Sequence, residues 1–140
     1  MVCTFFGHHD CPSSIKPLLK ETIKEQIGEG ITDFYVGNNG NFDRMAIDCL
    51  RELKQEYPEL RFVVVLAYLP AKNDLGKPSE TMYPEGMESV PKRFAIDYRN
   101  RWILRRSDVI ITYVTRPWGG ATKFAEIAEK QGKKILRLKT

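Results

Sequence analysis

Apolar residues follow two alternating patterns along this chain. Five short runs are almost continuously apolar and rich in β-branched and aromatic residues, which favours β-strands. Between these runs, apolar residues recur every three or four positions, which favours amphipathic helices. The predicted strands are residues 2–6, 33–36, 61–68, 109–114 and 134–138, and the predicted helices are residues 15–27, 42–57, 95–106 and 122–131.

The segment 61–68 gives the strongest strand signal, because nearly all of its residues are apolar, as in a strand covered on both faces. Strands that alternate with helices form a parallel sheet with helices on both faces. Right-handed crossovers then favour the strand order 3-2-1-4-5. The sequence therefore predicts an α/β fold, with one doubly wound, Rossmann-like domain over residues 1–140 and a five-stranded parallel sheet.

This strand order also predicts where a ligand binds. The direction of winding reverses between the first and fourth strands, and ligands of such folds bind outside the carboxyl ends of the strands at that point. The turns after the first, second and fourth strands are residues 7–11, 37–41 and 115–122. We expect these three turns to line one crevice.

The second turn is rich in glycine and asparagine. Gly37 and Gly40 allow backbone N–H groups to approach a ligand closely, and a helix N-terminus follows, so Gly37, Asn38, Asn39 and Gly40 are candidate phosphate ligands. The alternative is a plain turn between a strand and a helix. Asp43 falls in the first helical turn, where the helix dipole stabilises a carboxylate, or it accepts a ribose hydroxyl.

The turn after the fourth strand, residues 115–122, offers a second anion site. Gly119, Gly120 and Thr122 combine helix N-terminal N–H groups with a hydroxyl, which suits phosphate. Trp118 can stack on a base or pack against a neighbouring loop. Arg99, on the preceding predicted helix, can clamp the same phosphate or remain a solvated arginine.

The first turn contributes Gly7 and His8 to the predicted crevice. Residues 8–11 are two histidines, an aspartate and a cysteine, which are metal-ligand types. Adjacent side chains on one turn rarely converge on one ion, so we predict no metal site. A histidine beside a ligand phosphate is the better interpretation of His8, because its pKa lies close to neutrality.

Composition and charge narrow the class of protein. The chain is 42% hydrophobic and 29% charged, as is typical of soluble globular domains, and it shows no membrane-spanning run or signal-peptide pattern. Its three dispersed cysteines fit a reducing compartment, so we expect a cytoplasmic protein. The net charge of +4 is concentrated in residues 92–106 and at the C-terminus. Without a nucleic-acid-binding motif or interleaved aromatics, we expect solvated surface plus one phosphate contact rather than a nucleic-acid groove.

Two further segments carry predictions. Residues 70–91 contain four prolines and no helical stripe, which predicts a long irregular loop, either a lid or binding loop or a disordered insertion. Trp102, Ile103 and Leu104 are consecutive on a predicted helix, and three consecutive side chains cannot all face one core. We therefore expect a homo-oligomer that covers at least one of them.

The motifs in these turns resemble those of one superfamily. They are Phe6-Gly7-His8-His9, then Gly37 to Asp43, then Arg99-Asn100, and finally Pro117 to Thr122. This order resembles the SLOG superfamily, which joins the DNA-processing protein DprA to the LOG phosphoribohydrolases. The first seventy residues most resemble the YpsA-type branch, with its Thr-Gly-His-Arg opening and Gly-Gly-x-x-Gly-x-Asp turn. The resemblance implies a Rossmann-like fold with a pocket for a nucleotide or nucleotide-derived ligand, and no cofactor is required.

The resemblance leaves the activity open. It implies binding as a sensor or regulatory module, with a LOG-like nucleoside-monophosphate N-glycosidase and a DprA-like single-stranded DNA binder as alternatives. For the N-glycosidase, it implies Arg99 and a glutamate as catalytic residues, and Glu126 lies one residue later than the LOG pattern requires. Because one residue turns a helical side chain by about 100 degrees, the sequence predicts binding without efficient phosphoribohydrolase turnover.

Overall fold

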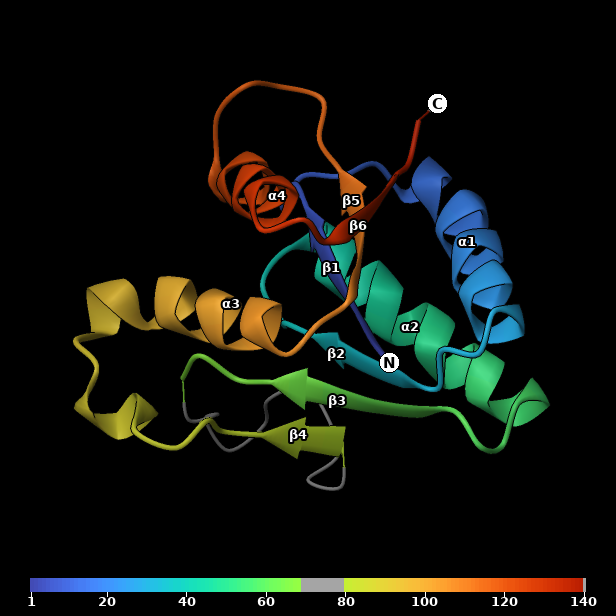
Figure 1. Cartoon of the computed structure of the whole chain (residues 1–140), viewed down its shortest axis with the longest axis horizontal. Coiled ribbons are helices and arrows are strands. Elements are labelled where there is room, and N and C mark those ends of the chain that lie inside the picture. Colours follow the sequence, from blue (N-terminus) through green and yellow to red (C-terminus); the bar gives the residue numbers. More distant parts are fainter. Residues whose placement is uncertain (69–79, 140) are drawn as a thin grey trace.

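A computed structural model describes residues 1–68 and 80–139 of the chain. Its centre is a six-stranded sheet in which every pair of neighbours is parallel, in the order β4-β3-β2-β1-β5-β6 (Figure 1). The strands are β1 (Val2–Gly7), β2 (Asp33–Val36), β3 (Arg61–Val65), β4 (Thr81–Met82), β5 (Val109–Tyr113) and β6 (Lys134–Arg137).

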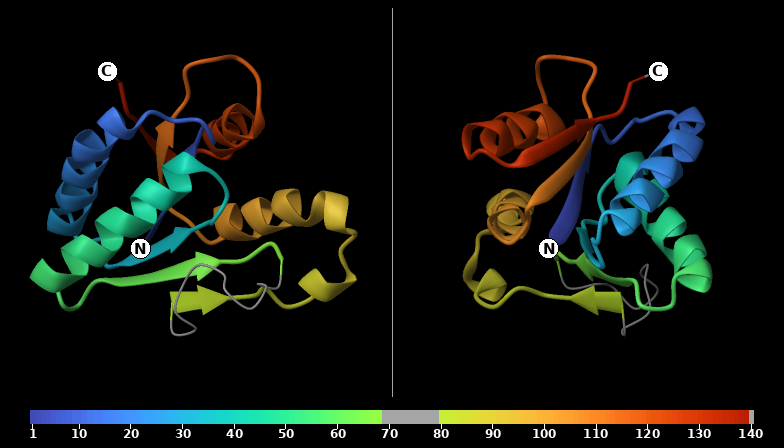
Figure 2. Two further views of the ribbon diagram at one scale, coloured as in Figure 1. Left: turned by 180° about the vertical axis from the view of Figure 1, so that it is seen from behind. Right: turned by 45° about the vertical axis from the view of Figure 1, so that its right-hand side comes forward.

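Helices cover both faces of this sheet. Figures 1 and 2 show α1 (Lys16–Gly28) and α2 (Asn41–Glu56) on one face and α3 (Ala95–Arg105) and α4 (Gly120–Lys130) on the other. Short 3-10 turns, η1 (Ser13–Ile15), η3 (Met87–Ser89) and η4 (Lys92–Phe94), complete the described elements. Within this described part of the chain, no helix has both the length and the apolar character needed to cross a membrane.

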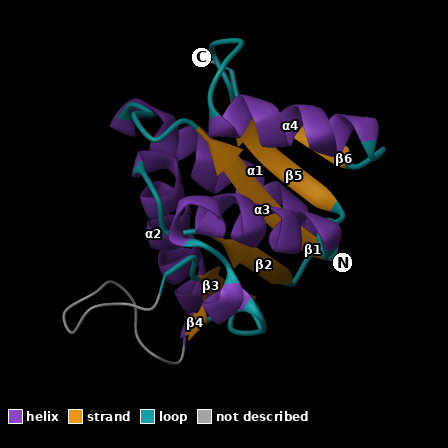
Figure 3. Ribbon diagram, turned by 90° about the vertical axis from the view of Figure 1, so that its left-hand side faces the viewer, coloured by secondary structure: helices purple, strands orange, loops and turns teal. Residues whose placement is uncertain are grey.

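The apolar core follows the predicted stripes. The larger cluster lies on the α1 and α2 side, where Leu19, Ile23 and Phe42 are fully buried against the sheet. A smaller cluster joins β1 and β5 to α4, with the Phe6 and Phe124 rings stacked at 5.4 Å between centroids. Helices cover both faces of the sheet (Figure 3), so its edges and the ends of its strands are the places where side chains can form a site.

The predicted five-stranded sheet in the order 3-2-1-4-5 is wrong, because the sheet has a sixth strand, β4, beside β3. The five predicted strands keep their relative positions as β3-β2-β1-β5-β6. Thr81–Met82 comprises only two residues in a proline-containing segment, too short to show any periodicity. The predicted irregular loop 70–91 is thus wrong over β4 and η3, and residues 69–79 lie outside the described part of the chain.

The three consecutive apolar residues on α3 divide as the helix geometry requires. Ile103 and Leu104 are each 1% exposed, because adjacent positions can share an apolar stripe about 100 degrees wide. Trp102 is partly exposed and packs on Tyr35 of β2, with ring centroids 5.6 Å apart, under the Arg106 guanidinium at 3.9 Å. One chain therefore accommodates all three, and the predicted homo-oligomer stays a prediction.

Candidate functional site

The carboxyl ends of β1, β2 and β5 open onto a cavity of about 320 Å³, walled by α3 and by the first residues of α4. We call this cavity the crevice. It is lined by Phe5, Phe6, Gly7, His8, His9, Gly37, Asn39, Asp43, Ile96, Arg99, Asn100, Ile103, Arg116, Trp118, Gly119, Gly120 and Ala121.

Most of the predicted site residues meet in this crevice. Those that line it are Gly7, His8, Gly37, Asn39, Asp43, Arg99, Trp118, Gly119 and Gly120. Four others, Asn38, Gly40, Thr122 and Glu126, do not line it. The three turns therefore converge at the reversal of winding, although individual residues have roles that differ from those expected.

Arg99 forms the floor of the crevice and is only 1% exposed. Its Nη1 donates to the Val65 carbonyl at 2.9 Å and to Asn38 Oδ1 at 3.4 Å, and its Nη2 donates to Asn39 Oδ1 at 2.7 Å. Its Nε donates to Asn100 Oδ1 at 2.8 Å. Arg99 thus ties α3 to the turn after β2, and the three asparagines hold Arg99 through their side-chain oxygens.

The charge of Arg99 has no close counter-charge in the described part of the chain. All of its hydrogen-bond acceptors are neutral, and no carboxylate there lies within 4.0 Å of its guanidinium. Burial lowers the pKa of Arg99, although the Asp43 charge opposes this. Burial also raises the pKa of Asp43 to about 6, against the attraction of Arg99 and the hydrogen bond from the Asn39 N–H. Asp43 therefore compensates the guanidinium only in part.

Two glycines in these turns are required by protein packing. A Cβ at Gly37 would lie 2.8 Å from Asp43 Oδ2 and 2.9 Å from Arg99 Cζ, and a Cβ at Gly7 would overlap the Phe42 ring. The close approach that the sequence pattern indicated is therefore made by side chains of the protein itself. It brings the Arg99 and Asp43 side chains against the backbone of the turn.

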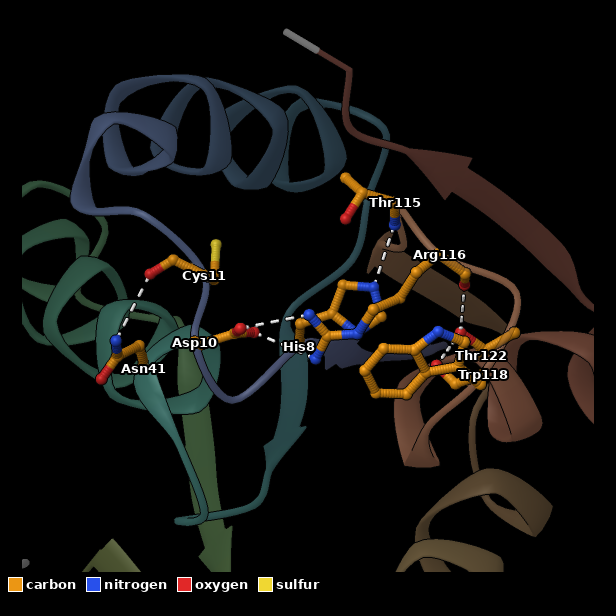
Figure 4. A network of polar contacts seen from close by, with 8 residues as sticks. All are labelled: His8, Asp10, Cys11, Asn41, Thr115, Arg116, Trp118 and Thr122. Carbon is orange, nitrogen blue, oxygen red and sulfur yellow. Dashed lines mark hydrogen bonds and ion pairs between the residues drawn. The ribbon is translucent and has the colours of Figure 1, made fainter.

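His8 is 3% exposed and fixed by the neighbouring turn. The Thr115 N–H donates to His8 Nε2 at 2.9 Å (Figure 4), so this nitrogen carries no proton and the neutral ring carries its proton on Nδ1. Burial, and secondarily the charge of Arg116, lowers the pKa of His8, which also favours the neutral ring. His8 therefore offers an N–H donor rather than a positive charge.

The hydroxyl group of Thr122 closes the turn between β5 and α4. Thr122 Oγ1 lies 2.8 Å from the Arg116 carbonyl and 3.0 Å from the Trp118 carbonyl, to which it donates (Figure 4). Thr122 thus shapes the turn and does not face the crevice. Gly119, with φ of 104°, is the N-cap of α4, and no side chain caps this end. The first N–H groups of α4 begin at the crevice wall.

Glu126 lies away from the crevice. It is exposed and borders a separate surface hollow with Glu129 and Arg137. Ala121 lines the crevice, and a residue five positions later on a helix is rotated by about 140 degrees. Glu126 lies outside the crevice, as we expected from its displacement by one residue relative to the LOG pattern. The carboxylate of Asp43, in contrast, lines the crevice.

Sequence reasoning missed Arg116, which lines the crevice, and its ion pair with Asp10 outside the lining. Arg116 donates to both carboxylate oxygens of Asp10, each at 3.1 Å, and lies over the Trp118 ring at 4.4 Å (Figure 4). Its Nε is buried and has no hydrogen-bond partner. The signal available for Arg116, though not for its pairing with Asp10, was an arginine two residues before a tryptophan in a turn already assigned to the crevice.

Metal-ligand side chains do not gather in the crevice. Across residues 1–68 and 80–139, no group of three or more His, Cys, Asp or Glu side chains is arranged to hold a metal ion. Asp10 instead binds Arg116, whose hydrogen bonds hold the pKa of Asp10 below its usual value.

Comparison with known protein families identifies the group to which the chain belongs. The YpsA model, described as the YspA SLOG family, matches residues 2–135. The chain belongs to this SLOG family. The match includes all three turns of this SLOG protein's crevice, so the expected resemblance is confirmed. No curated protein sequence matches this SLOG protein.

Solved structures similar to this SLOG protein include two DNA processing proteins A. The protein from Helicobacter pylori, described for its single-stranded DNA binding mode, matches with a TM-score of 0.68 and 15% identity over 100% of this chain and 66% of its own. The DprA of Streptococcus pneumoniae matches with a TM-score of 0.71 and 15% identity over 99% of this chain and 50% of its own. This SLOG protein thus spans about half to two thirds of their lengths, and at this identity the likeness concerns the fold.

Proposed function

We propose that the crevice binds a nucleotide or nucleotide-derived small molecule and that the protein acts as a sensor or regulatory module. The observation that carries this proposal is the buried Arg99 guanidinium on the crevice floor, which has only neutral hydrogen-bond acceptors and a partly compensating Asp43. A buried charge is costly unless it is paired. An anionic group of a bound ligand would provide the missing negative charge, because it would attract the Arg99 guanidinium electrostatically across the crevice.

The remaining walls support a ligand with both a phosphate and a base. The uncapped N-terminus of α4 favours an anion near Gly120 and Ala121. Trp118 is 63% exposed and presents a ring on which a base can stack. The volume of about 320 Å³ lies at the lower end of small-molecule sites, about 300–1,000 Å³, which favours a mononucleotide over a dinucleotide.

Calorimetric titration tests this proposal. We expect AMP to bind with a dissociation constant below about 1 mM, and adenosine to bind far more weakly. The variant Gly120→Ala adds a methyl group at a crevice-lining position where no protein atom lies within 4 Å, so it weakens nucleotide binding while the fold is retained.

The matched control is Gly28→Ala. This glycine also has no protein atom within 4 Å of an added Cβ and no positive φ, but it ends α1, outside the crevice lining. We expect Gly28→Ala to bind nucleotides as the wild type does. Failure of every nucleotide and of inorganic phosphate to bind at millimolar concentration would refute the proposal.

A second candidate function is the binding of single-stranded nucleic acid. From the sequence we expected no aromatic residues interleaved with the basic ones. In the fold, however, three exposed aromatic rings make cation–π contacts with basic side chains: Arg116 lies over Trp118, Arg93 over Phe94, and Lys92 over Tyr68. Grooves that combine cations with stacking rings suit single strands. An oligonucleotide that binds about tenfold or more tightly than its mononucleotide, with strong salt dependence, would favour this function over the first.

A further inference from the structure

Arg116 is the second arginine of the crevice, and its contacts differ from those of Arg99. Its two terminal nitrogens donate to the two oxygens of Asp10, so one N–H of each is occupied. One face of the guanidinium lies against the Trp118 ring. These contacts, made by the turn after β1 and by the turn before α4, fix the plane of the guanidinium.

The Nε of Arg116 is left over from this arrangement. It is buried and has no hydrogen-bond partner, although the side chain as a whole is 22% exposed and lines the crevice. A buried donor without an acceptor is rare in folded proteins, because it loses its bonds to water without replacement. The accessible area of Nε is too small for a ligand oxygen to reach it, so the donors open to a ligand are the terminal N–H groups: each Nη carries two, and Asp10 accepts only one from each.

We propose that a terminal N–H of Arg116 donates to an oxygen of the ligand's phosphate, and that Arg116 is the residue by which the crevice distinguishes a phosphorylated from an unphosphorylated nucleoside. This inference rests on the proposed function and extends it to a residue and a ligand group. Asp10 is the positioning residue, because its two hydrogen bonds hold the guanidinium in place and leave one N–H on each terminal nitrogen. Trp118 places the base on one face of its ring while Arg116 occupies the other.

The contacts of the two arginines explain why Arg116, and not Arg99, donates to the phosphate. Arg99 uses Nε, Nη1 and Nη2 for acceptors of the protein, so it acts on the ligand mainly through its charge. Arg116 is held in place and keeps a free donor. Hydrogen bonds from a charged donor are about twice as strong as neutral ones, so such a contact separates AMP from adenosine.

The test measures dissociation constants for AMP and adenosine in wild type, Arg116→Gln, Asp10→Asn and the double variant. We expect Arg116→Gln to weaken AMP binding about tenfold or more and to leave adenosine within about twofold. Asp10→Asn weakens AMP binding by about threefold to fivefold, because the fork loses its bidentate partner. In the Arg116→Gln background the Asp10 exchange has no further effect.

The matched control is Arg101→Gln. Arg101 also donates to an aspartate, Asp97, at 2.7 Å and also lies over an aromatic ring, that of Phe124 at 5.7 Å, but it does not line the crevice. We expect this variant to bind AMP within about twofold of the wild type.

Several results would overturn the inference. They are an unchanged AMP affinity in Arg116→Gln, an equal loss for AMP and adenosine, an equal loss in Arg101→Gln, and tighter AMP binding in Asp10→Asn. If Arg116→Gln fails to fold, as judged by circular dichroism, Asp10→Asn on the exposed side of the pair decides the matter. If the wild type binds AMP and Arg116→Gln binds it equally well, only this inference fails. If the wild type binds no nucleotide, the proposed function fails with it.

Discussion

The exchange Asp43→Asn tests whether burial or the Arg99 charge dominates at the crevice floor. Burial raises the pKa of Asp43 from its usual 3.8 to about 6. A carboxyl group whose pKa is higher in the folded than in the unfolded state stabilises the fold while the group is protonated. The wild type therefore loses stability relative to the asparagine variant as the pH rises from about 4 to about 6, and the difference is constant at higher pH.

The magnitude follows from the size of the pKa change. One pKa unit corresponds to about 1.4 kcal/mol, so the raised value of about 6 predicts a change of about 2–3 kcal/mol, allowing for the partial exposure of Asp43. Asparagine keeps an oxygen that can accept the Asn39 N–H. The exchange at one pH also removes an attraction to Arg99, so the informative quantity is the change in the stability difference between pH 4 and pH 8.

Urea unfolding at several pH values measures this quantity, with the fluorescence of Trp102 and Trp118 as the signal. His8 is present in both chains, so its own titration cancels to first order in the difference. The same exchange at Asp48, elsewhere on α2, is the matched control for changing an aspartate on this helix. A stability difference that is flat with pH, or that shifts in favour of the wild type as the pH rises from 4 to 8, would show that Arg99 outweighs burial and would refute the reasoning.

Two further variants test other parts of the site. Gly7→Ala places a Cβ in the Phe42 ring, so we expect a loss of about 1–3 kcal/mol in the free energy of unfolding, measured by urea titration, and an unchanged value would contradict the packing described for β1. Trp118→Ala removes an exposed ring, so we expect AMP binding to weaken about tenfold by calorimetry while inorganic phosphate is unaffected. Equal losses for both ligands would mean that Trp118 supports the turn rather than the base.

The regular parts of the fold could be predicted because their signals are local. Runs such as 109–114 and stripes such as that of α2 depend on neighbouring residues, and the crossover rules then ordered the five long strands. The strand β4 could not be predicted, because two residues carry no period and depend on the edge of β3 for their hydrogen bonds. The same limit explains why residues 70–91 resembled an irregular loop.

The crevice could be predicted at the level of turns but not of single contacts. Its position followed from the reversal of winding, and Arg99 and Asp43, both predicted as site residues, line it, while their predicted roles toward a ligand stay predictions. The partners of Arg99 depend on Val65, a residue of a different strand, 34 positions away. The Asp10 and Arg116 pair joins residues 106 positions apart, so no local pattern indicates it. Side-chain direction within a turn is likewise a property of the assembled fold, as Thr122 shows.

The central position of β1 has a consequence for how the protein folds. β1 pairs with β2 soon after it in the sequence, but its other neighbour, β5, lies far along the chain, and the two turns that they carry meet at His8 and Thr115, 107 positions apart. Closing so long a loop is entropically costly and slow. One edge of β1 therefore stays unpaired during synthesis until β5 has been made. The crevice comes into existence only at that late step, so any ligand that binds in it would selectively stabilise the completed sheet over every earlier intermediate.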